Sequence, residues 1–202
     1  IYVRLKTGLT IGSYNQNVTC TSTSAISKMS LLAGIVSPSA GSIIITEIMQ
    51  DPDIVDDAEG EYFEVYNTTA SDIDLQGWVI SDNGADSHSI NSSVIVPSGG
   101  YAILARDSNI AANGGFTANY EFSGFTLTNS NDEIILTSGI TEIDRVEYNN
   151  TSFPFTAGAS MELHLYKYDS TSNNDESNWG IATSSYGLGD LGTPGTNNDF
   201  GL

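Results

Sequence analysis

The stretch from Ile43 to Trp78 constrains the fold more than any other part of the chain. Two apolar, strand-like runs, Ile43–Met49 and Tyr62–Asn67, flank an acidic loop, and a polar turn then ends in Leu75-Gln76-Gly77-Trp78. Short runs of this kind, bounded by turn residues, are typical of β-strands. The stretch therefore predicts two neighbouring strands joined by a loop that carries most of the local charge.

The rest of the chain continues this pattern. Turn signals such as Asn83-Gly84 and Ser138-Gly139 separate short apolar runs, and no segment shows a sustained helical period. This spacing is typical of an all-β immunoglobulin-like β-sandwich. The further expected strands are Trp78–Ser81, Tyr101–Ala105, Glu133–Thr137, Ile143–Tyr148 and Ser160–His164.

The charge of the chain is distributed unevenly. Six basic residues stand against 25 acidic ones, a formal net charge of -19, which disfavours direct binding of nucleic acid or anionic membranes. Residues 1–41 hold three of the basic residues and no acidic one, whereas residues 42–202 have a net charge of -22. Because this change coincides with Ser37-Pro38-Ser39-Ala40-Gly41, we place a linker there.

The basic N-terminal piece shows three expected strands, Tyr2–Lys6, Ser13–Thr21 and Ser27–Val36. Its pattern resembles the last strands of Ig-like modules repeated in secreted proteins of Bacteroidetes-type bacteria. Three strands cannot close a core by themselves, so we expect an open edge able to pair with strands of another chain. The expected organisation is a partial β module at 1–36, a linker at 37–42, a sandwich at 43–197 and a tail at 198–202.

Cys20 is the single cysteine, which excludes an intrachain disulfide and a zinc site built on several cysteines. No apolar run approaches the length of a membrane span. The chain opens at Ile1 in mid-strand, without a signal peptide, and we expect it to be a fragment of a longer polypeptide.

Several motifs in order resemble the bacterial branch of the lamin tail domain family over about residues 43–197. They begin with Ile45–Pro52, Gly60–Asn67 and Asp74–Trp78, and continue with Ser81–Gly84, Val96–Tyr101, Asn131–Ile134, Gly158–Leu163, Ser177–Trp179 and Gly192-Thr193-Pro194-Gly195. The resemblance implies a non-catalytic immunoglobulin-like sandwich in a secreted or surface protein. It also implies other domains of the same polypeptide as partners, including nucleases, phosphatases or adhesion modules.

The acidic loop within the opening stretch is the candidate metal site. Six carboxylates within eleven residues repel one another unless they are solvated or neutralised by a cation, and calcium takes 6–8 oxygen ligands from such loops. The spacing differs from that of an EF-hand, so a solvated loop is the alternative to a Ca2+ site. The candidate ligands are Asp51, Asp53, Asp56, Asp57, Glu59 and Glu61. A second cluster, Asp169 to Glu176, is a weaker candidate.

The sequence offers little for catalysis. Only His88 and His164 are available as bases near neutral pH, and neighbouring Asp86, Ser87 and His88 cannot converge as a triad from one strand. Glu47 and Glu64 would form a carboxylate pair if their strands were neighbours, although a pairing with arginines is the alternative. We therefore expect no enzyme.

Two classes of binding function remain. A spacer or adhesion module of an extracellular protein needs no dedicated site and binds a surface protein. A carbohydrate-binding module needs a row of exposed aromatic side chains that bind a glycan. The candidates for that row are Tyr62, Tyr66, Tyr120 and Tyr148, and ordinary half-buried strand tyrosines are the alternative. The sequence favours the accessory module.

Overall fold

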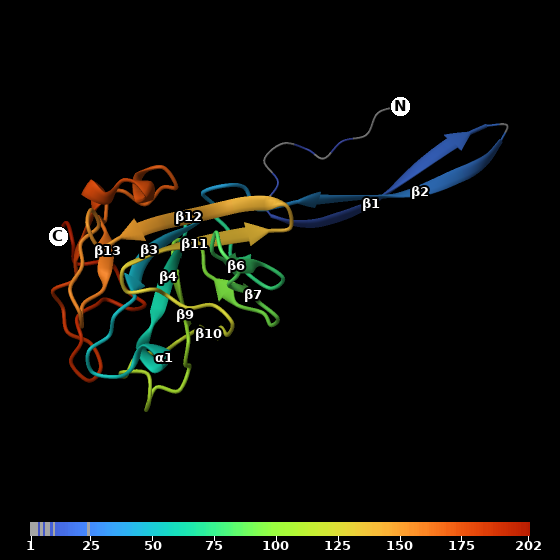
Figure 1. Ribbon diagram of the computed structural model, residues 1–202. Coiled ribbons are helices and arrows are strands. Elements are labelled where there is room, and N and C mark those ends of the chain that lie inside the picture. The colour runs from blue at the N-terminus through green and yellow to red at the C-terminus, as the bar shows by residue number, and fades with distance from the viewer. Residues whose placement is uncertain (1–3, 5, 7–8, 10, 24) are drawn as a thin grey trace. The chain divides into compact units, whose positions relative to one another are not determined.

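A computed structural model describes residues 4, 6, 9, 11–23 and 25–202 of the chain. The chain divides into two compact units, Ile1–Pro38 and Ser39–Leu202. Figure 1 shows the elements of each unit, and the two units are described separately below.

The first unit contains one antiparallel hairpin of β1 (Gly12–Ser22) and β2 (Ala25–Val36). These strands confirm two of the expected three, whereas Tyr2–Lys6 lies outside the described residues except for Arg4 and Lys6. Met29, Leu31 and Ile35 alternate along β2 and therefore share one face of the hairpin. Each of them is between 64% and 71% exposed, so the described part of this unit carries an exposed apolar face.

The second unit is an immunoglobulin-like β-sandwich, as the sequence predicts. Its six-stranded sheet has the order β10-β9-β4-β3-β13-β14, and its four-stranded sheet the order β12-β11-β6-β7. The six strands of the larger sheet are β3 (Ile43–Met49), β4 (Tyr62–Asn67), β9 (Tyr101–Ala105), β10 (Tyr120–Glu121), β13 (Met161–Leu163) and β14 (Trp179–Ile181). The smaller sheet contains β6 (Val79–Ser81), β7 (Ser87–Ser89), β11 (Asn131–Ser138) and β12 (Thr141–Asn149).

Short elements complete the unit. β5 (Ile73–Asp74) pairs with β8 (Ile95–Val96), and a single helical turn, α1 (Asp57–Gly60), lies within the acidic loop. Two 3-10 turns, η1 (Ser172–Asn174) and η2 (Glu176–Asn178), precede β14. Among the described residues, no helix is long and apolar enough to cross a membrane.

The inner face of the six-stranded sheet is apolar. Phe63 lies opposite Ile48 on one neighbouring strand and Leu104 on the other, and all three side chains are fully buried. The face meets the smaller sheet, since Ile45 N–H donates to the Asp144 carboxylate of β12 at 2.7 Å. Trp78, expected in the core, is 3% exposed.

A β-bulge in β3 decides what the outer face carries. The register shifts between Ile45, which pairs with Val65, and Glu47, which pairs with Glu64. Because the bulge inserts Thr46 as an extra residue, Glu47 changes faces and comes to lie on the outer face beside Glu64.

The C-terminal residues differ from the expected tail at 198–202. Asn198 is fully buried, and its side-chain amide donates to the carbonyl oxygens of Thr46 and Leu163 at 2.8 Å each. The segment Thr193–Phe200, here called the C-terminal strap, is therefore part of the sandwich. The sequence gives no apolar signal for it because backbone polar groups, rather than apolar side chains, provide most of its contacts.

Candidate functional site: a glutamate ladder beneath an aromatic groove

The acidic loop, which the sequence singles out for calcium, places two carboxylates together. Asn129 Nδ2 donates to Asp51 Oδ1 at 2.8 Å and to Asp57 Oδ2 at 3.3 Å. Burial raises the pKa of Asp51, and the nearby charges of Asp57 and Asp53 raise it further. The Asn129 amide thus bridges two of the candidate ligands.

Among the other candidate ligands, Glu61 has partners outside the loop. Glu61 is 2% exposed and accepts from Arg106 at 3.2 Å and from Leu127 N–H at 3.0 Å, while burial raises its pKa to about 7. The backbone N–H of Asp53 turns toward the Asp190 carboxylate at 3.3 Å, and Asp56 and Glu59 lie at the start of α1 and within it. The six side chains therefore do not form one calcium shell of 6–8 oxygens.

No group of three or more metal-ligating side chains is found in the described part of the chain. The weaker cluster at Asp169 to Glu176 is likewise divided, because Asn173 is buried and donates to Asp144 at 2.7 Å. Calcium binding by either segment stays a prediction for solution measurement.

The structure brings a different set of carboxylates together. Glu64, Glu47 and Glu162 lie directly opposite one another on the adjacent strands β4, β3 and β13. All three are fully buried, and we call them the glutamate ladder. The structure thus makes Glu47 and Glu64 neighbours, and their pairing with arginines, the alternative, is wrong: Arg106 and Arg145 bind Glu61 and Glu142.

The C-terminal strap covers the ladder and donates hydrogen bonds to every member. Thr193 N–H donates to Glu47 at 2.9 Å and Gly195 N–H to Glu64 at 2.6 Å. Asp199 and Phe200 N–H both donate to Glu162 Oε2, at 2.9 and 3.0 Å. Backbone N–H groups thus replace cations as the partners of these carboxylates.

The strap approaches the sheet so closely that a side chain at its start would collide. A Cβ atom on Gly192 would lie 2.6 Å from Tyr62 Oη and 2.7 Å from Glu47 Oε1. Gly192 is therefore required for space, which explains one position of the Gly192-Thr193-Pro194-Gly195 motif.

Electrostatics within the ladder favour the protonated acids. Burial raises the pKa of Glu64 well above its usual value, and the neighbouring Glu47 raises it further. The same two causes raise the pKa of Glu162 to about 7. In the described residues, both ion pairs of an acid with an arginine lie outside the ladder. The ladder is a proton-binding cluster without a basic partner.

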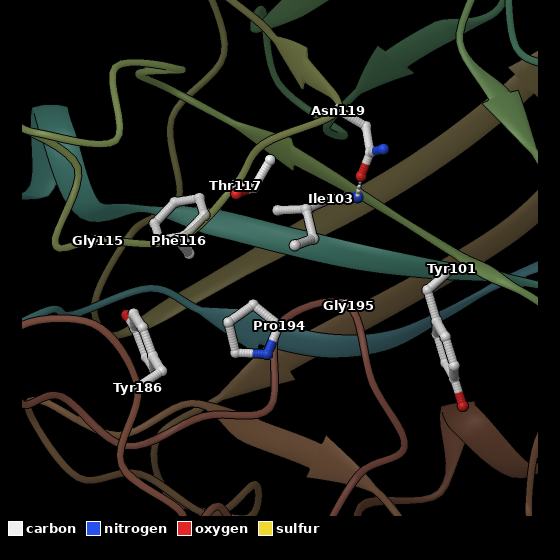
Figure 2. A pocket seen from close by; sticks show the side chains of 9 residues that line it. All are labelled: Tyr101, Ile103, Gly115, Phe116, Thr117, Asn119, Tyr186, Pro194 and Gly195. Atoms are coloured by element: carbon white, nitrogen blue, oxygen red, sulfur yellow. Dashed lines mark hydrogen bonds between the residues drawn. The ribbon is translucent and has the colours of Figure 1, made fainter.

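An aromatic groove lies beside the strap on the same face of the sheet. Its cavity of about 380 Å³ is lined by Tyr101, Ile103, Gly115, Phe116, Thr117, Asn119, Tyr186, Pro194 and Gly195. Figure 2 shows the rings of Phe116, Tyr186 and Pro194 at one end and Tyr101 at the other. Asn119 Oδ1 accepts from Ile103 N–H at 2.8 Å, which leaves the Asn119 amide nitrogen available to donate to a ligand.

The tyrosines expected as a sugar-binding row do not form one. Tyr62, Tyr120 and Tyr148 are buried, at 0%, 8% and 2% exposure. Tyr66 is half-buried, and its ring packs at 5.0 Å from that of Tyr101. The groove aromatics Tyr101, Phe116 and Tyr186 were not among the expected residues, because each is separated from the others by many residues of sequence.

The two histidines contact aromatic side chains outside the ladder. His88 lies in β7 and its Nε2 atom is 2.8 Å from Tyr120 Oη. His164 packs edge-to-face on Phe200 of the strap, with ring centroids 5.4 Å apart. Neither contacts the ladder through a hydrogen bond found in the described residues.

Comparison with known proteins gives the family. Residues 36–150 match the Lamin Tail Domain family, and the chain belongs to this family. The match overlaps the range expected from the sequence motifs over residues 43–150. A search of curated proteins gave no match. A solved structure of a DUF4876 family protein from Bacteroides thetaiotaomicron aligns with 95% of this chain and 85% of its own, at 11% identity and a TM-score of 0.43.

Proposed function

We propose that this chain is a non-catalytic accessory module, acting as a spacer or adhesion domain of a larger secreted or surface protein. The observation that carries the proposal is the burial of the glutamate ladder under the strap. Its carboxyl groups are the natural acid–base candidates, yet the strap buries all three and binds them with backbone N–H groups. A general acid or base must reach a substrate, and these groups face the protein's own backbone.

Membership of the Lamin Tail Domain family supports the same function, since the resemblance implies structural rather than catalytic domains. The net charge of -19 agrees with a location outside the cell and with protein or neutral glycan partners. An attached nuclease or phosphatase would make the module a targeting domain, a variant of the same proposal.

The test is surface labelling of intact source cells with an antibody against residues 39–202. We expect labelling without permeabilisation, and removal of the epitope when intact cells are treated with protease. Labelling that requires permeabilisation contradicts the proposal. An assay of the purified chain against phosphodiester, phosphomonoester and glycoside substrates is expected to show no turnover.

Carbohydrate binding is the second candidate, and the aromatic groove is the observation that favours it. Aromatic faces stack on sugar rings, and the Asn119 amide and Thr117 hydroxyl supply polar contacts nearby. Calorimetric titration with neutral oligosaccharides tests it. We expect Tyr101→Ala to abolish binding, while Tyr166→Ala, at an 80% exposed tyrosine outside the groove, leaves it unchanged.

Calcium stabilisation is tested by thermal melting with millimolar calcium or a chelator. If the Asp51–Asp57 pair holds the ion, calcium raises the melting temperature, and the double change Asp51→Asn and Asp57→Asn abolishes the effect. A melting temperature that does not respond rejects a structural calcium site in the acidic loop.

A further inference from the structure

The hydroxyl group of Thr193 lies between two carboxyl groups of the ladder. Thr193 Oγ1 is 3.3 Å from Glu47 Oε2 and 2.6 Å from Glu162 Oε1. A hydroxyl group has one proton and can donate to only one of these oxygens. The second oxygen makes a hydrogen bond to Thr193 only if it carries a proton of its own. The geometry therefore favours one protonated acid.

The hydrogen bonds of Glu47 indicate which of the two acids carries that proton. Glu47 Oε1 faces three donors, which are Tyr62 O–H at 2.6 Å, Ser160 O–H at 2.6 Å and Thr193 N–H at 2.9 Å. A carboxyl oxygen with this many donors is best matched by an ionised group. Glu47 then accepts the Thr193 proton as well, and Glu162 Oε1 supplies the proton for the short 2.6 Å contact.

The opposite oxygen of Glu162 completes the arrangement. Glu162 Oε2 accepts N–H donors from Asp199 and Phe200 at the far end of the strap. One protonated acid thus binds the strap at both ends: its hydroxyl donates to Thr193 and its carbonyl oxygen accepts from residues 199 and 200. The strap contributes no positive charge to the ladder, because it contains no lysine or arginine.

We propose that the glutamate ladder is a proton-operated latch, in which a proton on Glu162 holds the C-terminal strap against the sheet. Loss of that proton leaves two adjacent buried carboxylates with a single hydroxyl between them. Their repulsion is weakly screened because both are buried, and it is relieved when the strap lifts and water enters.

Other titratable groups among the described residues surround Glu162 on both sides. From the sheet, Glu47, Glu64 and Tyr62 face Glu162 or its neighbours, and Tyr101 and Tyr186 lie along the same face. From the strap, Asp199 adds a negative charge near Glu162, and its carboxylate accepts from Thr183 and Ser184. His164 contacts the strap through Phe200 and not through the ladder.

The latch also controls the aromatic groove. Pro194 and Gly195 of the strap form one wall of the cavity, and Gly195 N–H is held by Glu64. When the strap lifts, this wall moves away from Ile103 and Phe116 on the opposite side. The groove is therefore complete only in the protonated state.

Hydrogen exchange on the full chain tests the latch. After correction for the intrinsic pH dependence of exchange, we expect strap amides of residues 193–200 to exchange about tenfold faster at pH 8 than at pH 6. The factor follows from the pKa of about 7 for Glu162, because the ionised, unlatched fraction rises from roughly a tenth at pH 6 to roughly nine tenths at pH 8. Amides of β6 and β7 serve as the internal reference.

The matched variants are Glu162→Gln and Glu142→Gln. A glutamine at 162 reproduces the protonated acid, with its amide nitrogen donating to Thr193 and its oxygen accepting from Asp199 and Phe200. Its strap is expected to stay protected at both pH values. Glu142 is exposed on β12, and Glu142→Gln should keep the wild-type change. Wild-type strap exchange that is independent of pH, or an unchanged response in Glu162→Gln, overturns the latch.

A second measurement needs no variant. The backbone amide resonances of Asp199 and Phe200 report directly on the carboxyl group that they bind. We expect both to titrate together with a midpoint near pH 7 in the wild-type chain. A midpoint near pH 4.5, the ordinary value for glutamate, rejects a protonated Glu162.

Discussion

The two faces of the six-stranded sheet are equally buried but are held by different forces. The inner face packs Phe63, Ile48 and Leu104 against the smaller sheet, and its stability comes from the removal of apolar surface from water. The outer face carries Glu64, Glu47 and Glu162 under the strap, and its contacts are hydrogen bonds to backbone N–H groups. Burial therefore does not by itself tell which force covers a sheet.

The comparison predicts that the inner face tolerates truncation least. Phe63→Ala removes a fully buried ring and leaves a cavity, which should lower the free energy of unfolding by about 3–5 kcal/mol. Urea unfolding followed by tryptophan fluorescence measures the loss. If Phe63→Ala lowered the free energy of unfolding less than Thr193→Val does, the ranking of the two faces would be reversed.

The outer face should depend on single polar atoms. Thr193→Val keeps the shape but removes the hydroxyl between Glu47 and Glu162, and an unpaired buried polar group costs about 1–3 kcal/mol. The same urea experiment measures this effect. Thr117→Val, at an exposed threonine, is the control and should change stability by less than about 0.5 kcal/mol.

The pH dependence of global stability should also involve Asp144 of β12, which accepts a hydrogen bond from the backbone of β3. Burial raises the pKa of Asp144 from 3.8 to about 7 in the folded protein. Its contribution to stability is therefore fully present below about pH 4 and is lost as the pH rises to about 7. Asp144→Asn should flatten the decrease in melting temperature over this range. A variant that keeps the full wild-type decrease would exclude Asp144 as a source.

The hairpin should give the smallest effect on the sandwich. Met29→Ser with Leu31→Ser changes only the exposed apolar face of β2, so the unfolding of residues 39–202 should shift by less than about 0.5 kcal/mol. If residues 1–36 pair with strands of another chain, sedimentation velocity should show less self-association for this variant. Equal sedimentation of the variant and the wild type would exclude self-association through this face.

The fold could be predicted from the sequence because its signals are local. β3, β4 and β9 begin and end where the apolar runs predict, and the Gly77-Trp78 turn places a buried indole. Strands of two residues, such as β5 and β8, carry too little pattern to be recognised. The helical turn α1 is equally short.

The pairing of Glu47 with Glu64 could be predicted for neighbouring strands, but the full ladder and its cover could not, for two physical reasons. The bulge at Thr46 reverses the alternation of β3, so counting by twos places Glu47 on the wrong face. The cover of the ladder comes from a segment more than a hundred residues away from Glu47 and Glu64, and its asparagines and threonines resemble a loop. The acidic loop has a high local density of charge in the sequence. In the structure, its carboxylates bind separate partners, such as Arg106 and Asn129.

The position of the strap in the chain has a consequence for synthesis. Glu47 and Glu64 leave the ribosome long before Thr193, Gly195 and Asp199, which supply their covering donors. Until the strap emerges, the growing sheet exposes its outer face with ionised glutamates to water, and only its apolar inner face can be covered. The sandwich thus matures in two steps, and the second step requires the emergence of residues 193–200 from the exit tunnel and the uptake of a proton.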